Sequence, residues 1–440
     1  MSKVLPLLDI QKMQISDKAG AESWLLHFLQ ETEDTAIEKV ELQPKPESLN
    51  SINGFVTFTN KERFFFKSHV EENEKVSEYY NASILAQAGY PVIAARRIKQ
   101  RPGQQIAFYE VLSLSTLFDR LKEEEDWQHS NPQSKRGDNL VQAQEALDKK
   151  VTEILQGTVK PLSAGQHRQA PIHQLFSHRL AEDGRFGLFY KGKTLPLHEG
   201  EISFDKLSTM RWQINGVSYN STLHDIVGLA RELLAPKDGP AVIGHGDAHN
   251  GNIFVNMDLD SGAPLQSSNT ATGPGNASPK LVMFDPAFAG EHDPLLDITK
   301  PLFHNHFARW MYFPEQVDKE FDLSYSLQGD QISIEHSYAV SSLRKQLLRI
   351  KIKEVVKPLI AHLHGKKMLD GDWRRYLRCA MFCCPFLTVN LLAPAVAGGT
   401  LSERYSLTIK LLALSMAVEL GCENRTGSNQ FAELIDEILE

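Results

Sequence analysis

Alternating hydrophobic and polar positions in the first quarter of the chain predict a small β-sheet that carries one helix. The segments expected as strands are residues 37–42, 54–59, 63–69, 92–98 and 105–112. They alternate in polarity or are rich in β-branched and aromatic residues. Residues 72–88 contain neither glycine nor proline and predict a helix, which Gly89 and Pro91 end.

The second part of the chain has mostly helical spacing. Residues 223–234 predict a helix, preceded by short strands within residues 185–204 and 211–220. Residues 333–357 have the spacing of a long amphipathic helix, which Pro358 ends or kinks. The basic side chains of this last segment are expected on a solvated helix face: Arg344, Lys345, Arg349, Lys351 and Lys353.

The composition is that of an ordinary globular protein with an acidic balance. The chain has 440 residues, is 42% hydrophobic and 23% charged, and is long enough for two or three domains. Its net charge of −8 argues against a nucleic-acid partner, which requires a basic surface. The most apolar run, residues 380–397, is interrupted by Pro385 and Pro394, so it predicts a broken buried helix and no membrane span.

The cysteines and the N-terminus indicate a reducing compartment. Cys379, Cys383 and Cys384 lie close together and Cys422 follows, with no regular disulfide framework. We expect these thiols to pack as small hydrophobic groups and not to bind a metal. The first residues reach a charge too early for the apolar core of a signal peptide. A cytoplasmic location is therefore expected.

A polar loop between two apolar runs carries the first candidate catalytic groups. Residues 242–255 read VIGHGDAHNGNIFV. Asp247 is the candidate general base, which would orient an acceptor hydroxyl and take its proton. Asn252 offers an amide oxygen to a metal, and the same interval of five separates the Asp and Asn of the protein kinase catalytic loop. The simpler alternative is a polar turn capped by Asp247.

A second candidate group stands where the next apolar run ends. Residues 281–290 read LVMFDPAFAG and place Asp285 at a strand exit, where its carboxylate could hold Mg²⁺ against nucleotide phosphates. Pro286 fixes the turn, which disfavours a flipping activation segment. An Asp-Pro turn without a metal is the alternative. Residues 258–279, rich in Ser, Gly, Asn, Thr and Pro, predict a flexible inserted loop between the two motif strands.

The two motifs resemble those of the aminoglycoside phosphotransferase and choline kinase superfamily, whose fold is related to the eukaryotic protein kinases. The superfamily pattern His-Gly-Asp-x-His-x-x-Asn is matched at His245, Gly246, Asp247, His249 and Asn252. The resemblance implies that His245 supports the loop, and that His249 does the same or lines the acceptor pocket. It also implies that Asp297 braces the loop from a helix start, whereas N-capping alone would explain Asp293 equally well.

The resemblance implies an α+β, two-lobed, protein-kinase-like fold. Residues 1–112 would form the nucleotide-binding lobe, a small antiparallel sheet with one helix, preceded by an extension over residues 1–36. Residues 113–440 would form a larger, mostly helical lobe that carries the catalytic loop, the metal motif and the acceptor site.

Lys67 is the candidate phosphate-binding cation. It follows three phenylalanines, and strand alternation places it on the face of Phe65, opposite Phe64 and Phe66. The resemblance implies that Lys67 contacts the α- and β-phosphates and is held by a glutamate of the next helix. Glu78 is our choice for that glutamate and Glu74 the reserve. The alternative is an edge lysine that protects the sheet.

Two further segments complete the expected nucleotide site. Residues 48–54 (SLNSING) lie between the first two strands and would form the nucleotide-positioning loop, with Asn53 and Gly54 at its end. Glu110 and Leu112 would lie in the linker between the lobes, with backbone groups facing the nucleotide base. The second of these expectations rests on position in the chain alone.

The two loop histidines raise a competing hypothesis, a zinc site. Histidines four residues apart share a face only on a helix, and Asn250-Gly251 disfavours a helix here. Zinc proteases also have a glutamate directly after the first histidine, where this chain has Gly246. A zinc site is therefore not expected.

The sequence thus predicts a kinase that uses Mg²⁺ and ATP or GTP to phosphorylate a hydroxyl group of a small molecule. The acceptor would be a sugar or polyol, an aminoglycoside or an amino alcohol. The resemblance implies this activity, whereas the spacing alone indicates only phosphate and metal chemistry. Two alternatives stay open: a protein-kinase-like enzyme, and a non-catalytic, nucleotide-binding pseudokinase.

Overall fold

The computed structural model divides into two compact units, which are described separately. The first unit comprises residues 1–120 and 251–289, and the second comprises residues 121–250 and 290–440. The structure describes residues 7–32, 36–43, 51–69, 78–99, 105–111, 114–130, 137–256, 280–394 and 401–440. The segment 251–289, which we expected in the second lobe, therefore belongs with the first unit.

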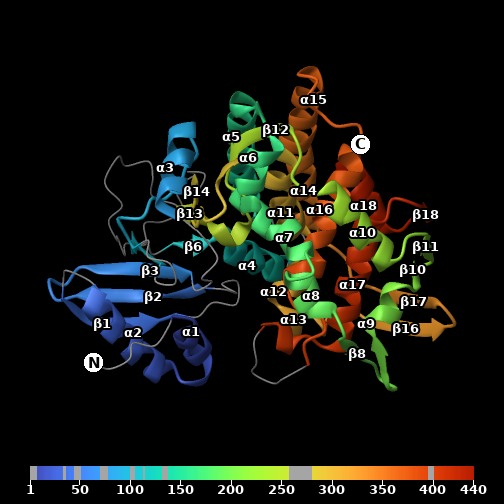
Figure 1. Ribbon diagram of the computed structural model, residues 1–440, viewed down its shortest axis with the longest axis horizontal. Helices are drawn as coiled ribbons and strands as arrows, with labels where there is room; N and C mark the ends of the chain where they lie inside the picture. The colour runs from blue at the N-terminus through green and yellow to red at the C-terminus, as the bar shows by residue number, and fades with distance from the viewer. Residues whose placement is uncertain are drawn as a thin grey trace. The chain divides into compact units, whose positions relative to one another are not determined.

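The first unit contains a five-stranded antiparallel sheet in the order β1-β2-β3-β5-β4, of which Figure 1 labels β1, β2 and β3. Its strands are β1 (Ile37–Leu42), β2 (Ser51–Phe58), β3 (Arg63–His69), β4 (Arg97–Lys99) and β5 (Gln105–Glu110). The bounds of β1 and β3 confirm the prediction, whereas β4 is shorter than the expected strand over residues 92–98. Because β3 lies at the centre of the sheet, the edge-strand alternative for Lys67 is wrong.

The N-terminal extension supplies the cover for one face of this sheet. Helices α1 (Leu7–Ser16) and α2 (Lys18–Thr32) pack their apolar side chains into one core with Phe66 and, at its margin, Phe64. Phe65 lies in a separate cluster with Ala95, Ala107 and Tyr109. The predicted alternation of the three phenylalanines is thereby confirmed.

A smaller antiparallel sheet and one helix complete the first unit. The sheet contains β6 (Ser115–Thr116), β13 (Ile253–Asn256) and β14 (Lys280–Met283), and the helix is α3 (Glu78–Ala88). The amide of Met283 donates to Pro91 at 2.7 Å, and the Asn81 side chain donates to the carbonyl of Ala287 at 3.2 Å. These bonds explain why residues 251–289 group with the first unit. The expected inserted loop over residues 258–279 lies outside the described residues.

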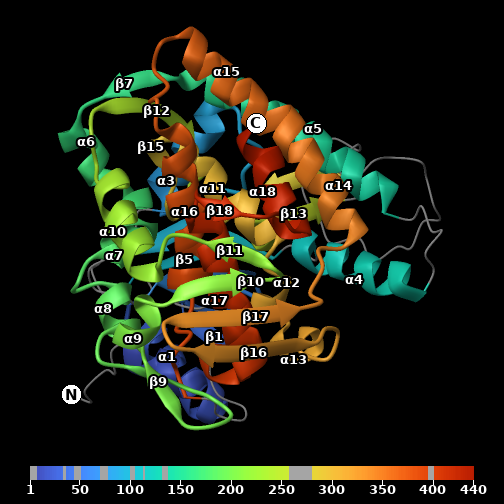
Figure 2. The same ribbon diagram turned by 90° about the vertical axis from the view of Figure 1, so that its right-hand side faces the viewer.

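The second unit is mostly helical, which agrees with the predicted α+β class (Figure 2). Its longer helices are α4 (Leu117–Ser130, which begins in the first unit), α5 (Asp138–Thr158), α10 (Leu223–Leu233), α11 (Pro294–His306), α14 (Ser342–Lys351), α15 (Lys357–Gly365), α16 (Trp373–Leu387), α17 (Leu407–Gly421) and α18 (Gln430–Leu439). Its short helices are α6 (Ala164–Gln169), η1 (Pro171–Leu175), α7 (Ser177–Leu180), α8 (Arg185–Tyr190), α9 (Phe204–Ser208), η2 (Asn250–Asn252, which ends in the first unit), α12 (Arg309–Tyr312), α13 (Pro314–Val317), η4 (Ile352–Val356) and η5 (Leu401–Arg404). Buried α11, α16 and α17 form much of its core.

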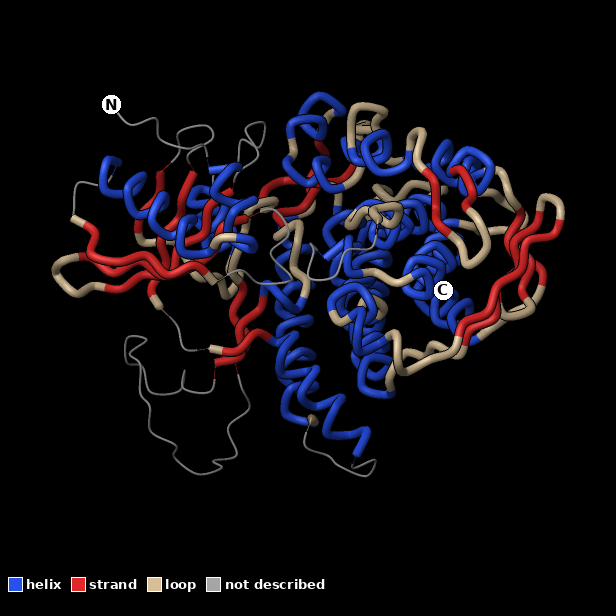
Figure 3. The backbone as a smooth tube through the Cα atoms, turned by 90° about the horizontal axis from the view of Figure 1, so that it is seen from below, coloured by secondary structure: helices blue, strands red, loops and turns tan. Residues whose placement is uncertain are grey.

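Strands lie at the margins of the helical unit. A mixed sheet has the order β16-β17-β10-β11-β18, and Figure 3 shows its strands beside the helices near the C-terminus. The strands of the second unit are β7 (Lys160–Leu162), β8 (Thr194–Pro196), β9 (Glu201–Ser203), β10 (Arg211–Ile214), β11 (Val217–Tyr219), β12 (Gly239–Gly244), β15 (Gly290–His292), β16 (Leu323–Gln328), β17 (Gln331–His336) and β18 (Arg425–Thr426). The predicted strands within residues 185–204 and 211–220 are present, although a helix, α8, occupies the start of the first segment.

The long helix predicted over residues 333–357 is wrong in its first part. Strand β17 covers residues 331–336, with Ile332 and Ile334 buried, and α14 begins only at Ser342. A period of two, and not of 3.6, governs these positions. The solvated face expected for the basic residues is also wrong for two of them: Arg344 and Lys351 are buried.

The cysteines and most of residues 380–394, the described part of the apolar C-terminal segment, are buried as expected, although the helix is not broken at Pro385. Helix α16 contains Pro385 and buries Cys379, Cys383 and Cys384 as free thiols. Burial raises the pKa of Cys379 and of Cys384 to about 12, which keeps both thiols protonated. In the part of the chain that the structure describes, no helix is long and apolar enough to cross a bilayer.

Candidate active site

The loop that carries Asp247 is held tightly at its base. Strand β12 leads into it, and Gly246 adopts a φ of +78°, which a residue with a side chain rarely takes. Nδ1 of the buried His245 accepts a hydrogen bond from the amide of Asp247 at 3.4 Å. The contact joins two residues of the loop, and the supporting role of His245 stays a prediction.

Asp297 braces the same loop from the first turn of α11. Its Oδ1 accepts the amide of Gly246 at 2.8 Å and lies 2.9 Å from Nε2 of His292. Burial opposes ionisation of Asp297, but the hydrogen bond and charge of His292 outweigh it and lower the pKa of the carboxyl group. A Cβ at Gly244 would stand 2.3 Å from Asp297 Oδ1, so this close approach requires glycine.

Asp293 is the N-cap of α11. Its Oδ1 accepts the amides of Leu295 at 2.8 Å and Leu296 at 3.2 Å. The sequence left two roles open for Asp293, N-capping and bracing of the loop. These two hydrogen bonds are those of an N-cap.

Two basic groups surround the carboxylate of Asp247. Nζ of Lys300 lies 3.3 Å from Asp247 Oδ1, and Nε2 of His249 lies 3.9 Å from the same atom. Lys300 is only 6% exposed, so the Asp247 carboxylate is part of what compensates its buried charge. Sequence analysis missed Lys300. Its one sequence signal is the spacing of three from Asp297, which puts both on one face of α11.

Lys300 also connects Asp247 to a neutral histidine. Nζ of Lys300 lies 3.4 Å from Nε2 of His304, and Nδ1 of His304 lies 2.7 Å from the Tyr312 hydroxyl. Burial, and then the charge of Lys300, hold the pKa of His304 well below its usual value. Because an ammonium group only donates, we assign Nε2 of His304 as the acceptor and Nδ1–H as the donor to Tyr312.

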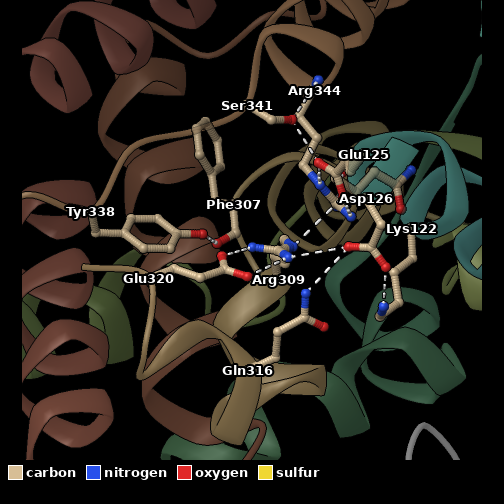
Figure 4. A network of polar contacts seen from close by, with 11 residues as sticks. Lys122, Glu125, Asp126, Phe307, Arg309, Gln316, Glu320, Tyr338, Ser341 and Arg344 are labelled. Atoms are coloured by element: carbon tan, nitrogen blue, oxygen red, sulfur yellow. Dashed lines mark hydrogen bonds and ion pairs between the residues drawn. The ribbon is translucent and has the colours of Figure 1, made fainter. Parts of the chain in front are cut away.

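Arg344 and Glu125 belong to a network of polar contacts, shown in Figure 4, and Arg344 also reaches a residue that contacts the far end of the loop. The amide of Asn250 donates to Asn305 Oδ1 at 2.7 Å, and Arg344 donates to the Asn305 carbonyl at 2.7 Å. Arg344 in turn binds both carboxylate oxygens of Glu125, at 2.6 and 2.8 Å. Burial alone would raise the pKa of Glu125, but the charge and hydrogen bonds of Arg344 lower it. Helices α4, α11 and α14 are thus tied to the loop that carries Asp247.

In the first unit, Lys67 forms an ion pair with Asp285. Lys67 comes from the central strand β3 and is 7% exposed. Asp285 follows β14 and has a φ of +59°, an uncommon conformation for a residue that precedes proline. Strained backbone of this kind is often retained where a side chain must be aimed. The residues selected for phosphate and for metal are therefore in contact.

Asn252 and Asp285 stand at the same end of the β13–β14 hairpin. Ile253 pairs with Met283, and beyond that pair the amide of Phe284 donates to the Asn252 carbonyl at 3.1 Å. One amide and one carboxylate oxygen are hard donors, which suit Mg²⁺ when phosphates and water complete its shell. Within the described residues, no group of three or more His, Cys, Asp or Glu side chains could hold a metal ion.

The remaining nucleotide-site residues are placed differently from expectation, or not described. Asn53 and Gly54 lie inside β2, opposite Lys67 and Phe66, and not in a loop. Gly54 is needed there because a Cβ would stand 2.2 Å from the carbonyl oxygen of Glu41.

Glu110, Leu112 and Glu78 complete this set. Glu110 ends β5, and its side chain forms an ion pair with Arg96. Leu112 lies outside the described residues. Glu78 is the first residue of α3, but its side chain is likewise not described, so its role as partner of Lys67 stays a prediction.

Comparison with known proteins returned solved structures only. No family model and no curated protein matches the sequence. An ethanolamine kinase from Plasmodium vivax matches with a TM-score of 0.41 and 10% identity, over 100% of this chain and 94% of the other. A spectinomycin phosphotransferase, solved with ADP and spectinomycin, has a TM-score of 0.34 and 11% identity, over 91% and 97%. A macrolide 2′-phosphotransferase from Brachybacterium faecium has a TM-score of 0.33 and 10% identity, over 96% and 98%. At such values we take the function from the side chains themselves.

Proposed function

We propose that this protein transfers the terminal phosphoryl group of ATP or GTP to a hydroxyl group of a small molecule, with Mg²⁺. The observation that carries the proposal is the ion pair of Lys67 with Asp285. A buried lysine and a carboxylate at a strand exit are what a nucleotide's phosphates and their metal require.

The roles of the first unit's residues follow from their chemistry. Lys67 would leave Asp285 and bind the α- and β-phosphates, while Asn252 and Asp285 would hold Mg²⁺. The bound metal would neutralise the charge that develops on the phosphates. Since the carboxylate and the ammonium group neutralise each other without ligand, neither charge is left uncompensated before the nucleotide binds.

Asp247 would act on the acceptor in the second unit. It accepts the proton of the attacking hydroxyl as the new O–P bond forms and the bond from the γ-phosphorus to the bridging oxygen breaks, which releases the nucleoside diphosphate. Lys300 keeps the carboxylate oriented through the 3.3 Å contact. The bracing of Gly246 by Asp297 holds the loop in one conformation during the transfer.

The groups around Asp247 favour an uncharged or anionic acceptor over an amine. Lys300 places a positive charge beside the base, and His304 and Tyr312 add neutral hydrogen-bonding atoms. Because the Asp247 carboxylate is already paired with Lys300, it would compensate the charge of a cationic acceptor poorly. We therefore place a sugar or polyol ahead of an amino alcohol or an aminoglycoside.

The short segment after Asp285 disfavours a protein substrate. Strand β15 begins at Gly290 and α11 at Pro294, so little chain is available for an activation segment. The pseudokinase alternative is disfavoured because the candidate base, both metal ligands and the phosphate-binding lysine are all present.

Nucleotide binding tests the first half of this proposal. We expect Mg²⁺ with ATP or GTP to raise the thermal stability of the wild type, by about 2.7 kcal/mol at 100 times the dissociation constant. The shift should require Mg²⁺ and disappear in Asp285→Ala. Asp318→Ala, at an aspartate of the second unit that has no role in the proposal, is the matched control and should keep the shift. No shift with either nucleotide would refute the nucleotide site.

A further inference from the structure

A second site is indicated by a cavity within the second unit. The cavity has a volume of 670 Å³, and its walls include Gly239 at the start of β12 and Asp293 at the N-cap of α11. The catalytic loop follows the other end of β12, about 17 Å along the strand. Lys300 lies about 10 Å further along α11 than Asp293. The cavity is therefore separate from the surroundings of Asp247, yet the two elements that hold the loop begin at its wall.

Two buried histidines on the cavity wall lack hydrogen-bond partners on one side. His167 is 3% exposed and His173 is 2% exposed, and among the described residues Nε2 of each ring has no partner. Nδ1 of His173 lies 3.2 Å from the Ser177 hydroxyl, which leaves Nε2 for a ligand. Buried polar atoms are nearly always paired, so two such atoms on one cavity indicate a missing hydrogen-bonding group.

The cavity interior disfavours charge. Burial, and then the neighbouring His167, lower the pKa of His173 to about 4, so this ring is neutral at physiological pH. Burial raises the pKa of Asp293 although the amides of Leu296 and Leu295 oppose the change. Burial and the adjacent Asp293 carboxyl raise the pKa of Tyr376 well above its usual value. A charged ligand would be poorly solvated here.

The other residues of the cavity wall suit a ligand that contains a ring. Trp373 and Tyr376 supply aromatic side chains, and Leu363 and Met368 add apolar surface. The charged residues Lys237 and Asp370 pair with each other at 2.7 Å, and both are about half exposed. Pockets of this size and composition, apolar with a few convergent polar atoms, are typical of small-molecule sites.

We propose that this cavity binds an uncharged, ring-containing small molecule with hydrogen-bonding atoms at one edge, and that its occupation stabilises the catalytic loop. The ligand stacks on Trp373 and pairs with the Nε2 atoms of His167 and His173, for which the described residues offer no partner. Its effect reaches the loop through α11, because Asp293 caps this helix and Asp297, one turn later, holds Gly246. The binding step does not depend on the proposed phosphoryl transfer.

Benzimidazole is the probe that tests the site. In protein labelled with ¹⁵N at its tryptophans, we expect benzimidazole to shift the indole signal of Trp373 in a saturable way, with that signal assigned by Trp373→Phe. Indene, which lacks the polar edge, and benzimidazole-5-carboxylate, which is charged, should bind at least fivefold more weakly. No shift of the Trp373 signal, or equal binding of indene, would overturn the site.

Two variants localise the binding and protect the test against misfolding. His173→Phe removes a polar wall atom, and Met368→Trp fills the cavity from a partly exposed position. Both variants should bind benzimidazole at least fivefold more weakly than the wild type. His178→Phe changes an exposed histidine of α7 outside the cavity and should leave the affinity unchanged. Unchanged affinity in a folded Met368→Trp variant would overturn the location.

Hydrogen exchange tests the link to the loop without any need for turnover. Saturating benzimidazole should slow amide exchange at least twofold in peptides covering residues 244–250, with no nucleotide present. Binding without slower exchange would overturn the coupling. A chain that binds the probe and slows exchange but never binds nucleotide would refute the proposed function alone, so the two failures are distinguishable.

Discussion

The ammonium nitrogen of Lys300 lies 3.3 Å from a carboxylate oxygen of Asp247, although the two residues come from different elements. If Lys300 orients the base, Lys300→Met should lower kcat about 100-fold, because the charge that positions the carboxylate is lost. KM should change little. The volume-conserving change should leave the fold intact. Lys345→Met, at a partly exposed lysine of α14, is the control and should retain activity.

A double-mutant cycle separates this role from a structural one. Lys300→Met combined with Asp247→Asn should cost little more than Asp247→Asn alone, since both changes disable the same step. Additive losses in kcat would show that Lys300 acts independently of the base.

Glu419 should make the protein less stable as pH rises. Burial raises the pKa of Glu419 to about 7 from 4.5, although Asn429 and Tyr219 donate hydrogen bonds to it. Between pH 4.5 and 7 the folded state keeps a proton that the unfolded chain has lost. Stability therefore falls through this window by about 3 kcal/mol. Glu419→Gln should abolish the fall, as measured by urea unfolding at pH 5 and pH 8. If the unfolding free energy of Glu419→Gln fell between pH 5 and pH 8 by as much as that of the wild type, or by more, the assignment to Glu419 would be wrong.

The protein should lose more unfolding free energy when one partner of the Glu125–Arg344 pair is removed than when both are removed. Arg344→Leu leaves the Glu125 carboxylate buried without its main partner and should cost about 3–5 kcal/mol of unfolding free energy. Adding Glu125→Met should recover much of that loss. Arg349→Leu, at an exposed arginine on the same helix, is the control and should cost about 0–1 kcal/mol. Chemical unfolding of the four proteins distinguishes a desolvated pair from a surface pair.

Two glycines should respond oppositely to alanine. At Gly54 the new Cβ would meet the Glu41 carbonyl at 2.2 Å, so Gly54→Ala should destabilise the sheet by about 2 kcal/mol or more. At Gly228, in the middle of α10, the Cβ meets nothing within 4 Å, and Gly228→Ala should stabilise by about 0.5–1 kcal/mol. Urea unfolding compares the two. Destabilisation of equal size at both positions would contradict the close approach of β1 and β2.

Strands β1 and β3 of the first unit were predictable because their signals are local, whereas helices α1 and α2 were not predicted. The alternation in residues 37–42 and 63–69 predicts both ends of these two strands correctly. The three phenylalanines before Lys67 indicate which face of the sheet its side chain occupies. The two motifs likewise identify Asp247 and Asp285 as candidate site residues from the sequence alone. Their contacts with Lys300 and Lys67 are long-range, so no local pattern contains them.

The failures have physical causes of the same kind. The buried pair Ile332 and Ile334 has the period of a strand, but it precedes a true amphipathic helix, and the two patterns merged into one predicted helix. The sequence alone predicts a surface position for Arg344, because its partner Glu125 is distant in sequence and contacts it only in the folded protein. Asn53-Gly54 is a turn signal, yet here the glycine serves the close approach of two strands.

Phosphoryl transfer to a panel of sugars, polyols and amino alcohols, followed by ³¹P NMR with Mg²⁺ and ATP or GTP, tests the central claim most directly. The wild type should form a phosphate monoester with at least one acceptor. Asp247→Asn should form it at least 100-fold more slowly while it still binds the nucleotide. Equal rates in the two proteins, or nucleotide binding by the wild type with no monoester from any acceptor, would contradict the account.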